Sequence, residues 1–163
     1  MLDFKVHFTP YFDLEQVNTR LMFVVQTEVY SAIERKDTVA FWNAIEVLKE
    51  YDTDKEYNFK EIDDRITMWT TNKTLVLTAE LSLYEKIGDS EKYDEVLKQY
   101  LEKIGDDYNA LKTFAWGNYL KYDDKTKLQK SVDCVKRSIE LNSNYENNDT
   151  YACLLYHFIK LFE

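Results

Sequence analysis

The chain has 163 residues, 45% of them hydrophobic and 31% charged, a balance typical of a folded globular protein rather than a disordered or fibrous one. Three glycines and one proline are too few for the turns of an all-β protein, so an all-α fold is expected. The net charge of −9 disfavours nucleic acid and anionic membranes as partners. No apolar run approaches the roughly 20 residues that cross a bilayer, so no membrane insertion is expected.

The first ten residues differ in pattern from the rest. Apolar and polar side chains alternate over residues 2–8, and this period of two indicates an extended segment that Pro10 ends. No second strand pattern lies nearby. Two alternatives remain: the segment lies along a helical surface, or it pairs with another chain.

Residues 13 to about 48 have the pattern of a helical hairpin. Asp13 is expected to cap the first helix, with Gln16 completing a capping box. After a turn at residues 35–37, Asp37 or Thr38 caps the second helix. The apolar positions expected to face a core are Leu14, Val17, Leu21, Val24, Val25, Val29, Ala32 and Ile33 in the first helix, and Val39, Phe41, Trp42, Ile45 and Leu48 in the second.

The middle of the chain is predicted to hold three helices. Residues 52–58 read as a loop, and Asn58 can cap a helix that runs to Trp69. A threonine-rich stretch favours a break near Thr71. A helix from about residue 73 ends at Gly88, the residue type preferred after a helix, and Ser90 caps the next helix, which runs to Ile104.

Three further helices are predicted in the C-terminal part. The first runs from Tyr108 to Leu120, and the turn at residues 123–124 separates it from a helix at residues 128–141. A polar loop is expected at residues 142–148. Asn148 or Asp149 then caps a final helix that ends near Phe162.

Residues 128–143 resemble the second helix of a tetratricopeptide repeat. Ser131 and Ser138 stand where small residues let neighbouring helices approach, while Ser143 replaces the usual proline, so the repeat is degenerate. The resemblance implies antiparallel helix pairs stacked as a short α-solenoid.

A longer stretch, residues 75–160, resembles the helical tail that follows the thioredoxin domain in many bacterial envelope proteins. The segments that carry this resemblance are Tyr100-Leu101-Glu102, residues 111–116, residues 138–141 and residues 148–156. The chain has no Cys-x-x-Cys motif and no βαβ alternation, so the resemblance implies the helical scaffold without redox chemistry.

The sequence offers few candidates for chemistry, and no catalytic, cofactor-binding or metal-binding residue is predicted. Cys153 and His157 share one helix face, as half of a metal site or of a thiol–imidazole pair would, but a packing face is the favoured interpretation. Only Cys134 could be a third zinc ligand. The adjacent aspartates at 63–64, 106–107 and 123–124 fit helix starts and turns, where carboxylates favour the helix dipole.

Binding is the function that the sequence favours. The tetratricopeptide resemblance implies a concave face lined by the first helix of each pair. Mapped onto this chain, the face holds Thr78, Ser82, Glu85, Trp116, Leu120, Cys153 and Tyr156. Trp116 is the candidate anchor, although burial between helices is the favoured alternative for a large aromatic residue.

We therefore expect residues 1–163 to form one helical-repeat domain, a non-catalytic module that binds a protein or peptide. The acidic surface favours a basic partner. One alternative is a structural accessory or dimerisation domain of a larger exported thioredoxin-family protein, and another is an enzyme with an unrecognised site. The expected location is the cytoplasm if Met1 is the native start, and the periplasm or envelope if the chain is a fragment.

Overall fold

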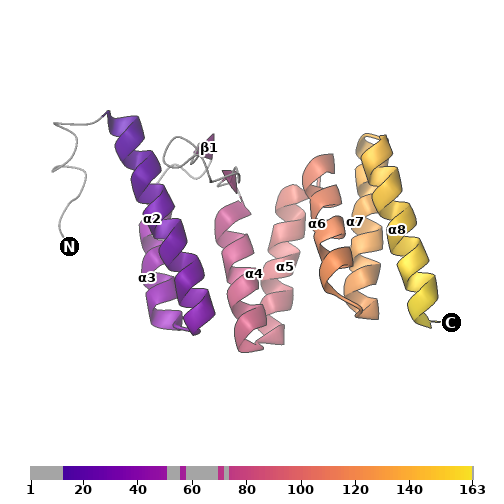
Figure 1. Ribbon diagram of the computed structural model, residues 1–163, viewed down its shortest axis with the longest axis horizontal. Helices are drawn as coiled ribbons and strands as arrows, with labels where there is room; N and C mark the ends of the chain where they lie inside the picture. Colours follow the sequence, from indigo (N-terminus) through magenta and orange to yellow (C-terminus); the bar gives the residue numbers. More distant parts are fainter. Residues whose placement is uncertain (1–12, 51–55, 58–69, 72–73, 163) are drawn as a thin grey trace. The chain divides into compact units, whose positions relative to one another are not determined.

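A computed structural model describes residues 13–50, 56–57, 70–71 and 74–162 (Figure 1). In these ranges the chain is all-α, as predicted, with one short strand pair that was not predicted. The extended segment at 2–8 and the helix from Asn58 to Trp69 lie outside the described residues. The elements are α2 (Leu14–Arg35), α3 (Thr38–Lys49), β1 (Glu56–Tyr57), β2 (Thr70–Thr71), α4 (Leu75–Ile87), α5 (Ser90–Ile104), α6 (Tyr108–Lys121), α7 (Lys125–Leu141) and α8 (Tyr145–Phe162).

The chain divides into two compact units, residues 1–98 and residues 99–163, and α5 crosses the boundary between them. Each unit is described by itself below. The prediction of one domain and the prediction of a stacked α-solenoid both stay predictions.

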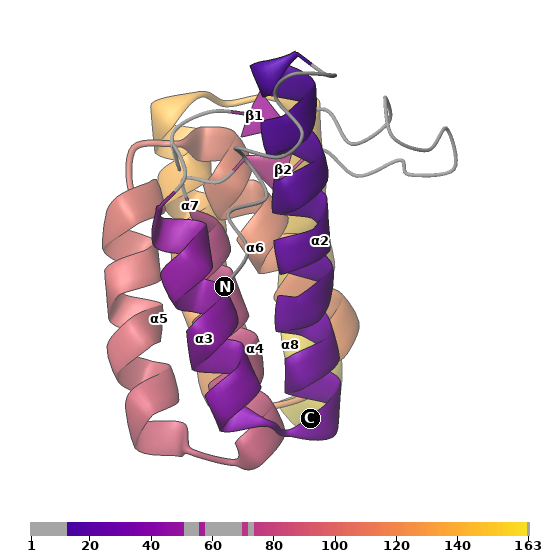
Figure 2. The same cartoon turned by 90° about the vertical axis from the view of Figure 1, so that its left-hand side faces the viewer.

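In the first unit, α2 and α3 form an antiparallel hairpin, and α4 packs against it (Figure 2). Asp13 caps α2 and Asp37 caps α3, each through its side-chain oxygen, as predicted. Lys36 takes the left-handed conformation that the tight turn between the two helices requires. The core is made of Met22, Val29, Ala32, Ile33, Phe41, Ala44, Ile45, Leu48, Leu75, Ala79 and Leu83.

Several predicted core positions of the first unit are exposed instead. Leu14 and Val24 in α2 and Val39 and Trp42 in α3 all lie on the solvent side. Residues 21–25 are apolar throughout, so they cover most of the circumference of the helix, and periodicity could not select Met22 as the buried member.

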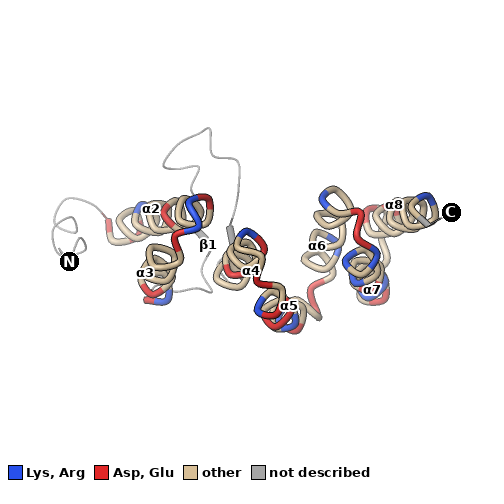
Figure 3. Tube along the Cα trace, turned by 90° about the horizontal axis from the view of Figure 1, so that it is seen from below, with Lys and Arg blue, Asp and Glu red and all other residues tan. Residues whose placement is uncertain are grey.

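In the second unit, α7 packs against both α6 and α8 (Figure 3). Ser131 and Ser138 on α7 are fully buried, as the repeat pattern predicted, because their small side chains let α6 and α7 approach. Each also satisfies a polar contact: Ser138 Oγ donates to Tyr108 O, and Asn118 Nδ2 donates to Ser131 Oγ. The core is made of Ile104, Leu111, Ala115, Leu128, Val132, Cys134, Val135 and Leu154.

Two predicted helix starts are wrong. Helix α5 is capped by Asp89 rather than Ser90, since Asp89 Oδ1 accepts from the Lys92 N–H at 3.1 Å. Helix α8 begins at Tyr145, inside the stretch predicted as a loop, because Asn144 caps it. Asn148 thus lies within the helix.

Candidate functional site

Two polar contacts link α6, and the turn after it, to α8 in the second unit. Lys112 Nζ lies 2.5 Å from Glu146 Oε2 at the start of α8. Toward the end of α8, His157 Nε2 lies 2.9 Å from Oδ1 of Asp123, which follows α6. Between these pairs in sequence come Trp116 and Tyr119 on α6 and Cys153 on α8. We call this strip, from Lys112–Glu146 to Asp123–His157, the α6–α8 seam.

Aromatic rings continue the seam. The ring of Trp116 stacks on Tyr119, with centroids 5.0 Å apart and planes inclined by 28°. Tyr119 in turn meets the His157 ring edge-on at 5.4 Å. Trp116 is half-buried, so its side chain is neither fully packed between the helices nor fully exposed to solvent. The ring is thus packed against Tyr119 while part of its surface stays exposed to solvent.

Two predicted groove residues flank the seam and are largely exposed. Leu120, one helical turn after Trp116, is 67% exposed, and Tyr156, beside His157, is 62% exposed. Cys153 is half-buried. Val39 and Tyr145 are as exposed or more so, and it is the position of Leu120 and Tyr156 along the aromatic seam that makes them candidates.

The remaining candidates lie in the first unit. Thr78 and Ser82 are half-buried on α4, and their hydroxyls donate to backbone carbonyls within that helix, Thr78 to Leu75 O and Ser82 to Thr78 O. Glu85 is also half-buried on α4. The predicted set is therefore divided between two units, and Trp116, Leu120, Cys153 and Tyr156 are the members that belong to the seam and its flanks.

The cysteines and histidine of the second unit do not converge on one point. Within the described residues, no group of three or more histidine, cysteine or acidic side chains could hold a metal ion. Burial raises the pKa of the Cys134 thiol to about 11, so this residue is a thiol, not a nucleophilic thiolate, at neutral pH. His157 has Asp123 and Tyr119 as its partners.

Asn147 is the polar residue that the sequence reading missed. It is fully buried between α7 and α8, and its amide donates to Asn142 O at 2.8 Å and to Ser138 Oγ at 3.2 Å. Its Oδ1 accepts from Asn144 N–H, and Asn144 Oδ1 accepts from Asn147 N–H. This is a capping box made of two asparagines, and the spacing Asn-x-x-Asn could have indicated it.

The charge of the molecule is concentrated in one unit. Residues 1–98 hold 20 acidic and 12 basic side chains, a net charge of −8, whereas residues 99–163 hold 10 acidic and 9 basic ones, a net charge of −1. The apolar candidates therefore lie in the nearly neutral unit, and the acidic excess that favours a basic partner lies in the other.

No protein-family model, curated protein or solved structure matches the chain. The resemblances to tetratricopeptide repeats and to the helical tails of thioredoxin-family proteins therefore stay predictions. In the described part of the chain, none of the helices has both the length and the apolarity to span a membrane.

Proposed function

We propose that the chain is a non-catalytic helical-repeat module that binds a protein or peptide, and that the α6–α8 seam is where the ligand docks. The observation that carries this proposal is the exposure of Leu120, one helical turn after the half-buried Trp116, and of Tyr156, next to His157 at the other end of the Trp116–Tyr119–His157 ring contacts. Tryptophan and tyrosine are the residues over-represented among binding hot spots, because one ring buries a large area at a small entropy cost.

The ligand class follows from charge and shape. A short segment with one or two apolar anchors and flanking Lys or Arg fits a nearly neutral docking surface in a chain of net charge −9. Apolar contacts at the seam determine the dissociation rate of the peptide, while the net negative charge of the chain raises its association rate. Added salt should therefore weaken binding mainly through the association rate.

A selection of random peptides on the whole chain tests this proposal. Enriched peptides are expected to pair an apolar anchor with basic residues. Replacing Trp116 by Ala, or either Leu120 or Tyr156 by Glu, should weaken their binding by about 30-fold or more, the effect of losing roughly 2 kcal/mol at a hot spot.

The matched control is Val39→Glu, because Val39 is 70% exposed on α3 in the first unit. This variant introduces the same charge at an equally exposed apolar site away from the seam, and it should bind the peptides as the native chain does. A selection that enriches no peptide, or peptides that bind L120E and V39E equally well, would contradict the proposal.

A further inference from the structure

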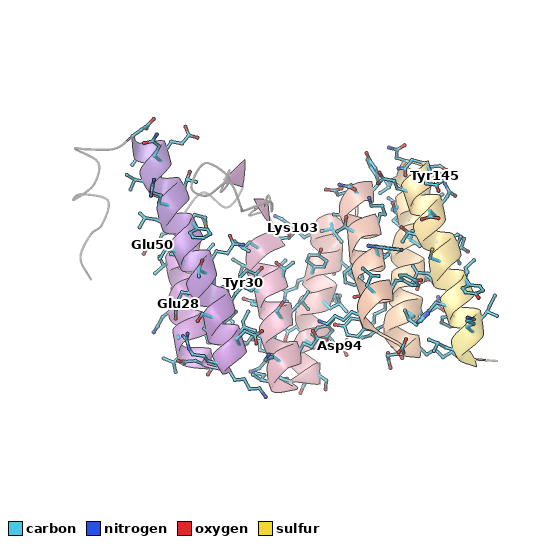
Figure 4. All side chains as sticks on the ribbon, viewed as in Figure 1. Glu28, Tyr30, Glu50, Asp94, Lys103 and Tyr145 are labelled. Carbon is cyan, nitrogen blue, oxygen red and sulfur yellow. The ribbon has the colours of Figure 1, made fainter. Side chains whose placement is uncertain are left out.

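Helix α8 has a second surface, on the side away from its packing face. Asn147, Thr150 and Leu154 point into the unit and are buried. On the opposite side Tyr145 is 83% exposed and Ile159 is 56% exposed, with Ala152 and Leu155 also exposed between them. Figure 4 shows Tyr145 at the first turn of the helix. We call these four residues, with Asn148, the α8 outer face.

The spacing of the α8 outer face is that of a two-helix interface. Tyr145, Ala152 and Ile159 follow one another at seven-residue intervals, and Asn148 and Leu155 fall between them. A seven-residue apolar repeat of this kind keeps one seam facing a partner helix. The repeat extends over roughly 20 Å of helix, and most of α8 is uncharged (Figure 3).

The charges of α8 indicate how a partner helix would run. Asp149 and Lys160 are both exposed and flank the outer face on the side of Tyr156, one near the start of the helix and one near its end. Lys160 Nζ lies 5.1 Å from the centre of the Tyr156 ring, so this side of the outer face borders the proposed peptide site. In an antiparallel pair of α8 helices, equivalent sides face each other, so the side that carries Asp149 in each copy would face the side that carries Lys160 in the other. In a parallel pair the same sides lie on opposite edges of the interface, so these charges would not meet.

We propose that the α8 outer face binds the α8 outer face of a second copy of this chain, antiparallel and about a two-fold axis. Near the axis Ala152 of each copy lies opposite Leu155 of the other, so that a small residue accommodates a large one. The same surface serves both partners, which is the commonest form of homodimer interface. A single helix face is small for an interface, so the dimer is expected to be weak and to depend on concentration.

Sedimentation velocity on the whole chain, from about 1 µM to about 1 mM, tests the proposal. A reducing agent prevents disulfides through Cys153 from mimicking a dimer. The native chain should shift from monomer to dimer within this range, and Ile159→Glu should raise the dimer dissociation constant by about tenfold or more. Val39→Glu, the exposed control on α3, should leave the constant unchanged.

A charge exchange tests the antiparallel arrangement. Asp149→Lys and Lys160→Glu should each weaken the dimer, and the double variant should restore it, because the pairing is then reversed rather than lost. A chain that stays monomeric, a V39E variant that weakens the dimer as much as I159E does, or a double variant no better than the single ones would each overturn the proposal. L120E should leave the dimer intact, so failure here and failure of the proposed peptide site are distinguishable.

Discussion

The buried side chain of Asn147 links two helices of the second unit. Its amide holds together the end of α7, through Ser138 and Asn142, and the start of α8, through Asn144. Since Asn147 is fully buried, its side chain finds these partners only in this arrangement of the two helices.

Replacing Asn147 by Leu should therefore destabilise the protein by about 2 kcal/mol, although the volume is similar. The substitution removes the hydrogen bonds to Asn142 and Ser138 and the side-chain acceptor of the Asn144 N–H at the start of α8. Urea unfolding of the variant measures the loss. Asn43→Leu, at an exposed position on α3, serves as the control, and equal losses for the two variants would contradict the role assigned to Asn147.

Glu80 on α4 is a half-buried acid of the first unit whose pKa is shifted. Burial raises the pKa of its carboxyl, and the charge of Lys49 counteracts only part of this. Because the folded-state pKa lies above the unfolded one, the ionised carboxylate opposes folding at neutral pH. The opposition fades as pH falls through the folded-state pKa.

Glu80→Gln should accordingly stabilise the chain at neutral pH, and the gain should shrink in acid. Chemical unfolding of the variant and of the native chain, at neutral and at acidic pH, measures the difference in their free energies of unfolding. Glu46→Gln, an exposed acid on α3, is the control and should change stability little. A gain that is constant with pH would show that burial of the charge is not its cause.

At the scale of single helices, three aspartates have the same task at successive turns of the chain. Asp89, Asp107 and Asp124 cap α5, α6 and α7, and the carboxylate of Asp107 accepts from two backbone N–H groups, those of Asn109 and Ala110. The aspartate pairs 106–107 and 123–124 were correctly interpreted as helix starts and turns. The pair at 63–64 lies outside the described residues.

Asp107→Ala should cost about 1 kcal/mol of stability, the usual effect of losing a side-chain cap. Asp106 is the matched control: it is adjacent, its side chain is 97% exposed, and its partner is Arg137 at 3.4 Å. Asp106→Ala should cost clearly less, since exposed ion pairs contribute little. Thermal unfolding of both variants measures the two costs. If the loss at 106 matched the loss at 107, the capping explanation would fail.

The spacing of apolar residues and the residues at helix ends predicted most of the described helices. A Gly or Asp at a turn determines where a helix ends or begins through its own backbone conformation or hydrogen bonds. Gly88, at φ +80°, ends α4 where the sequence placed the end. The errors have equally local causes. In α2 the apolar run is uninterrupted, so the spacing of apolar residues could not indicate which face is buried. At α8 two asparagines form the capping box, which is usually recognised from Ser or Thr followed by Glu or Gln.

At the scale of the whole molecule, composition predicted the fold class but not the organisation into two units. The compactness of residues 1–98 and 99–163 depends on which helices contact each other, and turn signals do not encode this. For the same reason the predicted groove residues could be assigned to helices correctly while their division between units could not be foreseen. Trp116, Leu120 and Tyr156 remain together as candidates.

We propose above that Trp116, Leu120 and Tyr156 form a peptide-docking surface. Nuclear magnetic resonance of the ¹⁵N-labelled chain, titrated with a selected basic peptide, tests this most directly. The largest shift changes are expected on the Trp116 indole and on the backbone amides of Leu120 and Tyr156. Shift changes confined to α2 and α3, with the Trp116 indole signal unmoved at saturation, would contradict it.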